Sequence, residues 1–312
     1  MLRHLLRTSD LTPRDLALLL DRAAAFKRDP YRARDRLRSE TVVLYFNKPS
    51  TRTRISFETA VVRLGGTPIG VGPNDLQLGR GETIEDTARV VGRYARAFVI
   101  RTFSHADVER FAAASAIPVV NALTDAHHPC QSLADLMTLR EKRGDLRKLR
   151  VAYVGAGNNV VHSLLEAAAL AGMQLAVATP ERFAPDPAIA ANARELARSS
   201  GGSIELGDDP EAAVRGADAV YTDAWLSMGD PASERAERLA ALARYQVNAA
   251  LLAHARADAL FLHCLPDHRG EEVTAEVADG PHSVIFEQAE NRLHTSVALL
   301  AALLDGALEG AA

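Results

Sequence analysis

The sequence predicts an α/β protein with two doubly wound domains, each built on a central parallel sheet. Short β-branched or apolar runs alternate with helical stretches along most of the chain, which is typical of parallel α/β architecture. The alternation occurs twice in series, and 312 residues exceed what one hydrophobic core usually holds. We therefore predict a first domain at residues 1–145 and a second at 146–288, joined by a bridging helix, with a C-terminal helix at about 289–312 that packs back on the first domain.

The composition excludes several classes of protein. The chain is 47% hydrophobic and has 36 Lys and Arg against 40 Asp and Glu, so we expect no binding to nucleic acid or to an anionic membrane. No apolar run approaches the roughly 20 residues that cross a bilayer. The two cysteines, Cys130 and Cys264, lack CxxC spacing, and the start does not resemble a signal peptide. We therefore expect a protein of the reducing cytoplasm.

The first helix is predicted to begin at Pro13. Thr12 can cap it, and apolar side chains then fall on one face: Leu16, Leu19, Leu20 and Ala23. The arginine-rich start also resembles a transit peptide, but such peptides are poor in acids, and three aspartates intervene here: Asp10, Asp15 and Asp21. These features favour a docked amphipathic helix.

Strands are predicted wherever short apolar runs occur. Their positions are 41–46, 67–72, 97–102 and 117–123 in the first half, and 149–155, 174–180, 203–209, 218–225 and 259–266 in the second. A helix at 131–148, stopped near Gly144, is predicted to bridge the halves, and a last helix to extend from about 289 to 308. Because ligands of open parallel sheets bind beyond the carboxyl ends of the strands, the residues that follow each strand are the site candidates.

The stretch STRTR, residues 50–54, follows the first strand. Ser50 can cap the next helix, and Thr51, Arg52 and Thr53 would then offer backbone N–H groups, hydroxyls and a guanidinium to one phosphate. The alternative is a capped surface helix with solvated arginines. Arg54 lies two residues further on, and we expect it to form an internal salt bridge without a ligand role.

Two further strands of the first half also end in polar residues. Arg101 ends one, and His128 and Gln131 follow the other at the start of the bridging helix, where they can face the same crevice. His128 could instead be only a hydrogen-bonding residue at the helix entry. A metal site is not expected, because the adjacent His127 and His128 cannot both face one ion from a regular helix.

The turn GAGNN, residues 155–159, resembles the start of a dinucleotide fingerprint. Gly155 and Gly157 are present, but Val160 stands where the third glycine belongs. Asn158 and Asn159 place polar amides in the turn, which suits a polar or zwitterionic ligand. An NAD-linked dehydrogenase is the alternative that this turn alone supports.

The last two strands predicted in the second half have Asp223 and Cys264 near their ends. Asp223 could pair with an ammonium group, and the loop at Ser227 and Met228 could bind a carboxylate. A strand cysteine is more often packing than nucleophile. Because neighbouring side chains on a strand point to opposite faces, we expect His263 and Cys264 to be poor joint metal ligands.

Together these motifs resemble the aspartate/ornithine carbamoyltransferase family. The matches are STRTR (50–54), QLGRGETIEDTARV (77–90), HPCQSLAD (128–135), GAGNNVVHS (155–163), TDAWLSMG (222–229), HCLPDHRGEEVT (263–274) and QAENRLHT (288–295). The resemblance implies transfer of the carbamoyl group of carbamoyl phosphate to the δ-amine of L-ornithine, giving citrulline and phosphate, in arginine biosynthesis or citrulline metabolism. It also implies homotrimers, no cofactor and no metal. Alternative acceptors are N-acetylornithine and putrescine, and a non-catalytic binding regulator is a further alternative.

The resemblance also implies roles for individual residues. The carbamoyl phosphate site would contain Ser50, Thr51, Arg52, Thr53, Gln77, Arg101, His128, Pro129, Cys130, Gln131, Cys264, Leu265 and Arg292. The ornithine site would contain Asn159, Asp223, Ser227 and Met228, and the catalytic residues would be Arg101, His128, Asp223 and Cys264. Gln77 would come from a neighbouring subunit, and the Leu265–Pro266 bond would be cis. Asp267 and Val297 depart from the family pattern, outside this set.

Overall fold

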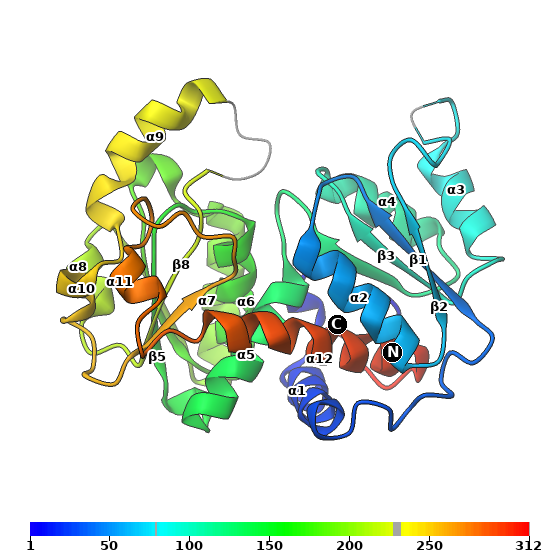
Figure 1. Cartoon of the computed structure of the whole chain (residues 1–312), viewed down its shortest axis with the longest axis horizontal. Coiled ribbons are helices and arrows are strands. Elements are labelled where there is room, and N and C mark those ends of the chain that lie inside the picture. The colour runs from blue at the N-terminus through cyan, green and yellow to red at the C-terminus, as the bar shows by residue number, and fades with distance from the viewer. Residues whose placement is uncertain (79, 227–231, 312) are drawn as a thin grey trace. The chain divides into compact units, whose positions relative to one another are not determined.

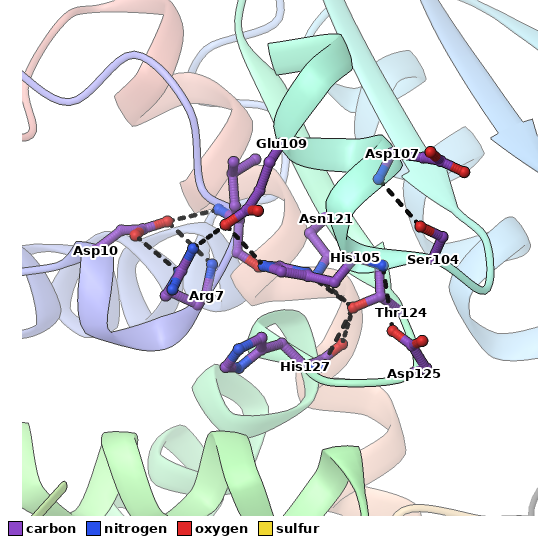
Figure 2. A network of polar contacts seen from close by, with 11 residues as sticks. Arg7, Asp10, Ser104, His105, Asp107, Glu109, Asn121, Thr124, Asp125 and His127 are labelled. Carbon is purple, nitrogen blue, oxygen red and sulfur yellow. Dashed lines mark hydrogen bonds and ion pairs between the residues drawn. The ribbon is translucent and has the colours of Figure 1, made fainter. Parts of the chain in front are cut away.

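The computed structural model describes residues 1–78, 80–226 and 232–311 of the chain (Figure 1). The chain divides into two units. Unit 1 consists of Met1–Met137 and Glu290–Ala312, and unit 2 of Thr138–Ala289. Each unit contains its own sheet of parallel strands with helices between them, which confirms the predicted fold class.

Unit 1 is built on a four-stranded parallel sheet in the order β2-β1-β3-β4. The strands are β1 (Thr41–Phe46), β2 (Thr67–Val71), β3 (Ala97–Arg101) and β4 (Val119–Leu123). The helices are α1 (Pro13–Arg28), α2 (Thr51–Arg63), α3 (Ile84–Val91), α4 (His105–Ala114), α5 (Pro129–Arg143), which extends into unit 2, and α12 (Ile285–Leu304), which begins in unit 2.

The strand order of this sheet reverses between β1 and β3. The β1–β2 and β3–β4 connections therefore leave in opposite directions, and right-handed crossovers place α2 and α4 on opposite faces of the sheet (Figure 1). On the α4 side, Phe98 and Phe111 stack with ring centroids 4.2 Å apart. The reversal brings the ends of β1 and β3 together, which is where ligands of such sheets bind.

Both chain ends are anchored in unit 1. The N–H of Leu5 donates to Val119 O (2.9 Å), and the N–H groups of Glu309 and Gly310 donate to the Asp15 carboxylate (2.7 and 2.9 Å). Burial alone would raise the pKa of Asp15, but these bonds and those from Thr12 lower it. Thr12 caps α1 as predicted, and the helix docks through its buried leucines.

Unit 2 is built on a five-stranded parallel sheet in the order β7-β6-β5-β8-β9. The strands are β5 (Arg150–Val154), β6 (Gln174–Ala178), β7 (Ser203–Gly207), β8 (Ala219–Thr222) and β9 (Leu260–His263). The helices are α6 (Asn159–Ala171), α7 (Pro187–Ser200), α8 (Pro210–Val214), α9 (Arg235–Leu242), α10 (Ala249–Leu252) and α11 (Ala275–Ala278). The order reverses between β5 and β8, so their carboxyl ends and that of β9 are neighbours.

Two predicted helix bounds differ from the structure. The bridging helix α5 begins at Pro129, two residues earlier than predicted, but it ends at Arg143 as expected, because Gly144 adopts φ +83° and a short 3-10 turn, Leu146–Lys148, follows. The last helix begins at Ile285, four residues earlier than predicted. Among the described residues, every helix is too short or too polar to cross a bilayer.

Candidate active site

In unit 1, the first candidate residues lie where β1 and β3 end side by side. Ser50 caps α2 by accepting a hydrogen bond from Thr53 N (3.2 Å), so the first turn of the helix begins directly after it. Phe46 is paired with Arg101 across the two strands, and Asn47 N donates to Arg101 O (2.8 Å). The cap of α2 and Arg101 therefore stand at adjoining strand ends.

Arg292 connects three helices through buried side chains. Its Nη2 donates to Thr53 Oγ1 (3.0 Å) and its Nη1 donates to Gln131 Oε1 (2.6 Å). Gln131 Nε2 in turn donates to Asp135 Oδ1 (2.8 Å). All four side chains are buried, with at most 2% of any residue exposed. The chain of bonds fixes Arg292, on α12, against the start of α2.

His128 lies immediately before α5 and is buried. Burial, followed by the charges of Arg292, Arg101 and Arg52, holds the pKa of its imidazole well below the ordinary value. The ring is therefore neutral at physiological pH and can donate a hydrogen bond without carrying charge. Three guanidinium groups from different elements thus act on one buried group, which favours an anionic ligand at this point.

Other predicted residues of unit 1 take different positions. Pro129 is the first residue of α5. Cys130 is buried, its thiol donates to Asn121 O (3.4 Å), and burial raises its pKa to about 12, so it is no nucleophile. Gln77 is exposed on the loop between β2 and α3.

The salt bridge predicted for Arg54 is present in the structure. Its Nε donates to Glu58 Oε1 at 2.9 Å, one helical turn along the exposed face of α2. Arg52 and Arg54 thus have different surroundings, although both belong to the STRTR stretch.

In unit 2, Asp223 follows β8 and is held at both carboxylate oxygens. Oδ1 accepts a hydrogen bond from Cys264 Sγ (2.9 Å), and Oδ2 accepts one from Asn158 Nδ2 (2.7 Å). The oxygen of the Asn158 side chain caps α6 by accepting from Val160 N and Val161 N (3.0 and 3.1 Å). The sequence indicated the Asn158 amide as a group for a polar ligand, but it did not indicate that this side chain caps α6 or binds Asp223.

Three residues predicted for the amino-acid ligand remain. Asn159 begins α6 and is partly buried. Ser227 and Met228 lie outside the described residues.

The expectation that His263 and Cys264 point apart was wrong. The side-chain atoms of Asp223, His263 and Cys264 that are able to bind a metal, one from each residue, all lie within 4.8 Å of one another. The strand ladder ends with the pairing of Thr222 and His263, so the alternation rule no longer holds at Cys264. Leu265 then adopts φ +58°, and the Leu265–Pro266 bond is cis, as the resemblance implied.

The GAGNN turn does not have the surroundings of a dinucleotide site. A β-carbon on Gly157 would lie 2.5 Å from backbone atoms of Ala184 and Pro185, and Gly157 N donates to Phe183 O (2.7 Å). This glycine therefore makes room for the protein's own chain, whereas in a dinucleotide fold it makes room for the pyrophosphate. The side chain of Asn158 also occupies the first amides of α6.

The two departures from the family pattern have local partners. Asp267 accepts a hydrogen bond from Arg269 Nη1 (2.8 Å). Val297 is fully buried in α12, where it belongs to the apolar core.

Comparisons with known proteins agree with this geometry. Residues 3–141 match the family model described as aspartate/ornithine carbamoyltransferase, carbamoyl-P binding domain, and residues 147–303 match its Asp/Orn binding domain. The ornithine carbamoyltransferase of Acidothermus cellulolyticus is 54% identical, over 98% of each chain, and that of Bacillus subtilis 49%, over 97% of this chain and 94% of the relative.

Solved structures show the same likeness. The ornithine carbamoyltransferase of Pyrococcus furiosus superposes with a TM-score of 0.93, at 47% identity and 98% coverage of each chain. That of Gloeobacter violaceus superposes with a TM-score of 0.88, at 47% identity, covering 97% of this chain and 99% of the other. These matches span both units, and the chain belongs to the aspartate/ornithine carbamoyltransferase family.

Proposed function

We propose that the chain is an ornithine carbamoyltransferase, which transfers the carbamoyl group of carbamoyl phosphate to the δ-amine of L-ornithine. The observation that carries the proposal is the set of three guanidinium groups, on Arg52, Arg101 and Arg292, that act on the buried, neutral His128. Such a set suits a small dianion whose carbonyl group needs a hydrogen-bond donor. The names of the relatives support ornithine as the acceptor.

In this proposal, unit 1 binds the leaving phosphate and polarises the carbonyl group. Arg52 holds the phosphate together with the start of α2, at Ser50, Thr51 and Thr53. Arg101 contacts both the phosphate and the carbonyl oxygen, and His128 donates to that oxygen. Because His128 is neutral, it stabilises the developing negative charge without transferring a proton first.

The carbamoyl NH₂ needs hydrogen-bond acceptors. Gln131 Oε1 already accepts from Arg292 at 2.6 Å, which leaves one lone pair for this group. The backbone carbonyls of Cys264 and Leu265 are the other acceptors that we assign. Arg292 then acts on the bound anion through its charge and holds Gln131 in place.

The acceptor amine is assigned to unit 2. Asp223 and Cys264 orient the δ-amine, and Asn159, Ser227 and Met228 bind the amino-acid end of ornithine. The amine nitrogen forms a bond to the carbonyl carbon, the bond from that carbon to the phosphate oxygen breaks, and the departing phosphate takes the proton of the amine. No covalent enzyme intermediate is needed, because positioning and charge stabilisation lower the barrier.

We further propose a homotrimer in the cytoplasm that serves arginine biosynthesis, with Gln77 reaching the site of a neighbouring subunit. We also propose that residues 1–145 with 289–312 bind carbamoyl phosphate and that 146–288 bind ornithine. Exposed apolar side chains on α2 and the edge strand β2 support association: Ile55, Val62 and Ile69.

A mixture of Gln77→Ala and Arg52→Ala chains, refolded together, should regain activity that neither has alone. If the mixture stays as inactive as its components, sharing of Gln77 is refuted.

A citrulline assay with four acceptors tests the proposed function. Ornithine should give a kcat/KM at least about a hundredfold above those of N-acetylornithine, putrescine and aspartate, because unpaired polar groups penalise the wrong acceptor. Turnover of N-acetylornithine or putrescine in preference to ornithine would replace the acceptor but keep the chemistry. Absence of phosphate release with every amine would refute the proposed activity.

A further inference from the structure

We propose that His263 and Glu272 are positioning residues for the proposed reaction: Glu272 fixes which ring nitrogen of His263 carries the proton, and His263 holds the backbone of Leu265 beside Cys264. The proposal rests on the proposed function for its kinetic readout only. Neither His263 nor Glu272 belongs to the residues assigned above to the substrates.

The two side chains form a buried pair behind the end of β9. Both are 0% exposed, and His263 Nε2 lies 3.2 Å from Glu272 Oε1. On the other side of the ring, Nδ1 accepts a hydrogen bond from Leu265 N at 2.9 Å. The backbone N–H of His263 donates to Gln288 Oε1 (3.0 Å), so the residue is held on three sides.

The direction of these contacts fixes the tautomer. Because Nδ1 accepts from an N–H group, it carries no proton, and the ring proton must lie on Nε2, the nitrogen that is 3.2 Å from the Glu272 carboxylate. Burial alone would raise the pKa of Glu272, but the contacts with His263 and with the N–H of His268 lower it, so the carboxylate is charged. A negative charge at this point favours the proton on Nε2, as in the carboxylate–histidine pairs that orient metal ligands.

The held turn is one that leucine does not adopt readily. Leu265 has φ +58°, in the left-handed region that favours glycine, so its conformation depends on contacts from its surroundings. The bond to His263 is such a contact, and it fixes the peptide between Cys264 and Leu265. That peptide also sets the direction of the Cys264 thiol, which donates to Asp223 at 2.9 Å. A movement of the turn would therefore displace the thiol and both assigned carbonyls together.

A role in packing alone does not account for the pair. A buried carboxylate and a buried imidazole are costly to desolvate, and well-packed apolar residues of similar size are often as stable or more so. An apolar pair, however, could not accept the hydrogen bond from Leu265. In the structure, the atom that accepts this bond is Nδ1 of His263.

Two substitutions of His263 separate its two nitrogens. In His263→Asn, the amide oxygen takes the place of Nδ1 and can still accept from Leu265. In His263→Gln, the longer amide reaches toward Glu272 but leaves the Leu265 N–H without its acceptor. We expect His263→Gln to lower kcat/KM for carbamoyl phosphate about tenfold or more relative to His263→Asn, per folded molecule, the scale of one buried hydrogen bond. Equal kcat/KM values for the two variants would overturn the proposal.

A second pair of variants tests whether Glu272 acts through His263, and it decides the matter if His263→Gln does not fold. Glu272→Gln should lower kcat/KM severalfold to tenfold in the wild-type chain, but less than about twofold when combined with His263→Asn, since no tautomer then remains to be fixed. An equal loss in both backgrounds would show a role independent of His263 and would overturn the proposal.

A readout without turnover separates this proposal from the proposed function. The alkylation rate of Cys264 by iodoacetamide should change in His263→Gln and stay near wild type in His263→Asn, because only the former releases the turn. If the wild-type chain fails to carbamoylate ornithine but this difference appears, the positioning role stands and the proposed function fails. If carbamoylation occurs but the alkylation rates do not differ, the positioning role fails.

Discussion

Replacing Arg52 or Arg54 by alanine gives a matched test of the phosphate assignment, because the two residues are two positions apart on α2. Among the described residues, the exposed Arg54 pairs with the half-buried Glu58, an i,i+4 contact worth about 0.3–0.5 kcal/mol. Arg52 instead acts electrostatically on His128. Loss of one preorganised charge contact typically costs about 2.7–4 kcal/mol of transition-state stabilisation, or roughly 10²–10³ in rate.

The structure also shows how the Arg52 variant should fail. Burial and the charges of Arg292 and Arg101 lower the pKa of His128 more than Arg52 does, so the imidazole stays neutral without Arg52. The loss should therefore appear in kcat/KM for carbamoyl phosphate and in a weakened inhibition by phosphate. Arg54→Ala should stay within about threefold of wild type, as expected for an exposed pair. Initial rates of citrulline formation over a range of carbamoyl phosphate concentrations measure both variants. If Arg52→Ala and Arg54→Ala have equal kcat/KM, the phosphate assignment is refuted.

Three further predictions concern titratable groups of the protein and of the proposed substrate. In the native chain at pH 8, only Cys264 should react with a thiol reagent, because the pKa of Cys130 is about 12, and a thiol titre of two per chain would contradict this. The rate with ornithine should climb from about pH 6 to 9, because the δ-amine has a pKa near 10.4; a flat profile with rate-limiting chemistry would contradict it, since His128 stays neutral throughout. Burial lowers the pKa of His4 from 6.5 to about 4. Between these two pH values the unfolded chain binds a proton at His4 that the native chain does not bind, so the free energy of unfolding decreases as the pH falls. The protection of the Val119 amide against hydrogen exchange, corrected for the intrinsic exchange rate at each pH, should fall over that range and not in His4→Asn, because Val119 N donates to His4 Nδ1 at 3.1 Å.

Local rules account for what the sequence predicted correctly. Caps at Thr12 and Ser50 need only a side-chain oxygen and the backbone N–H group three residues further along, and the structure contains both caps. The strand ends were predictable because alternating strands and helices imply parallel sheets, whose ligands lie at the carboxyl ends. The Arg54–Glu58 pair is equally local, since residues four apart on a helix are neighbours.

The contacts that the sequence did not predict join distant residues. Gln131 and Arg292 are 161 positions apart, and Asn158 and Asp223 are 65 positions apart. The local periodicity of the sequence therefore cannot predict that these side chains are in contact. The error at His263 and Cys264 has a different origin. Strand alternation depends on a continuing ladder, and the point at which a ladder ends is set by its neighbour, here β8.

The hydrogen bonds at Asp223 bear on how an acceptor amine would react. A bare buried carboxylate would bind the ammonium form of ornithine most tightly, and ground-state binding of the wrong protonation state raises the barrier. Here one carboxylate oxygen accepts from Asn158 at 2.7 Å and the other from Cys264 at 2.9 Å, so part of the negative charge is already compensated. Asp223 and Cys264 can still orient an amine, but the hydrogen-bonded carboxylate favours the ammonium form less than a bare carboxylate would. The thiol is therefore more useful in the proposed reaction as a hydrogen-bond donor than as a nucleophile, which is why replacing Cys264 by alanine should weaken the use of ornithine without abolishing turnover.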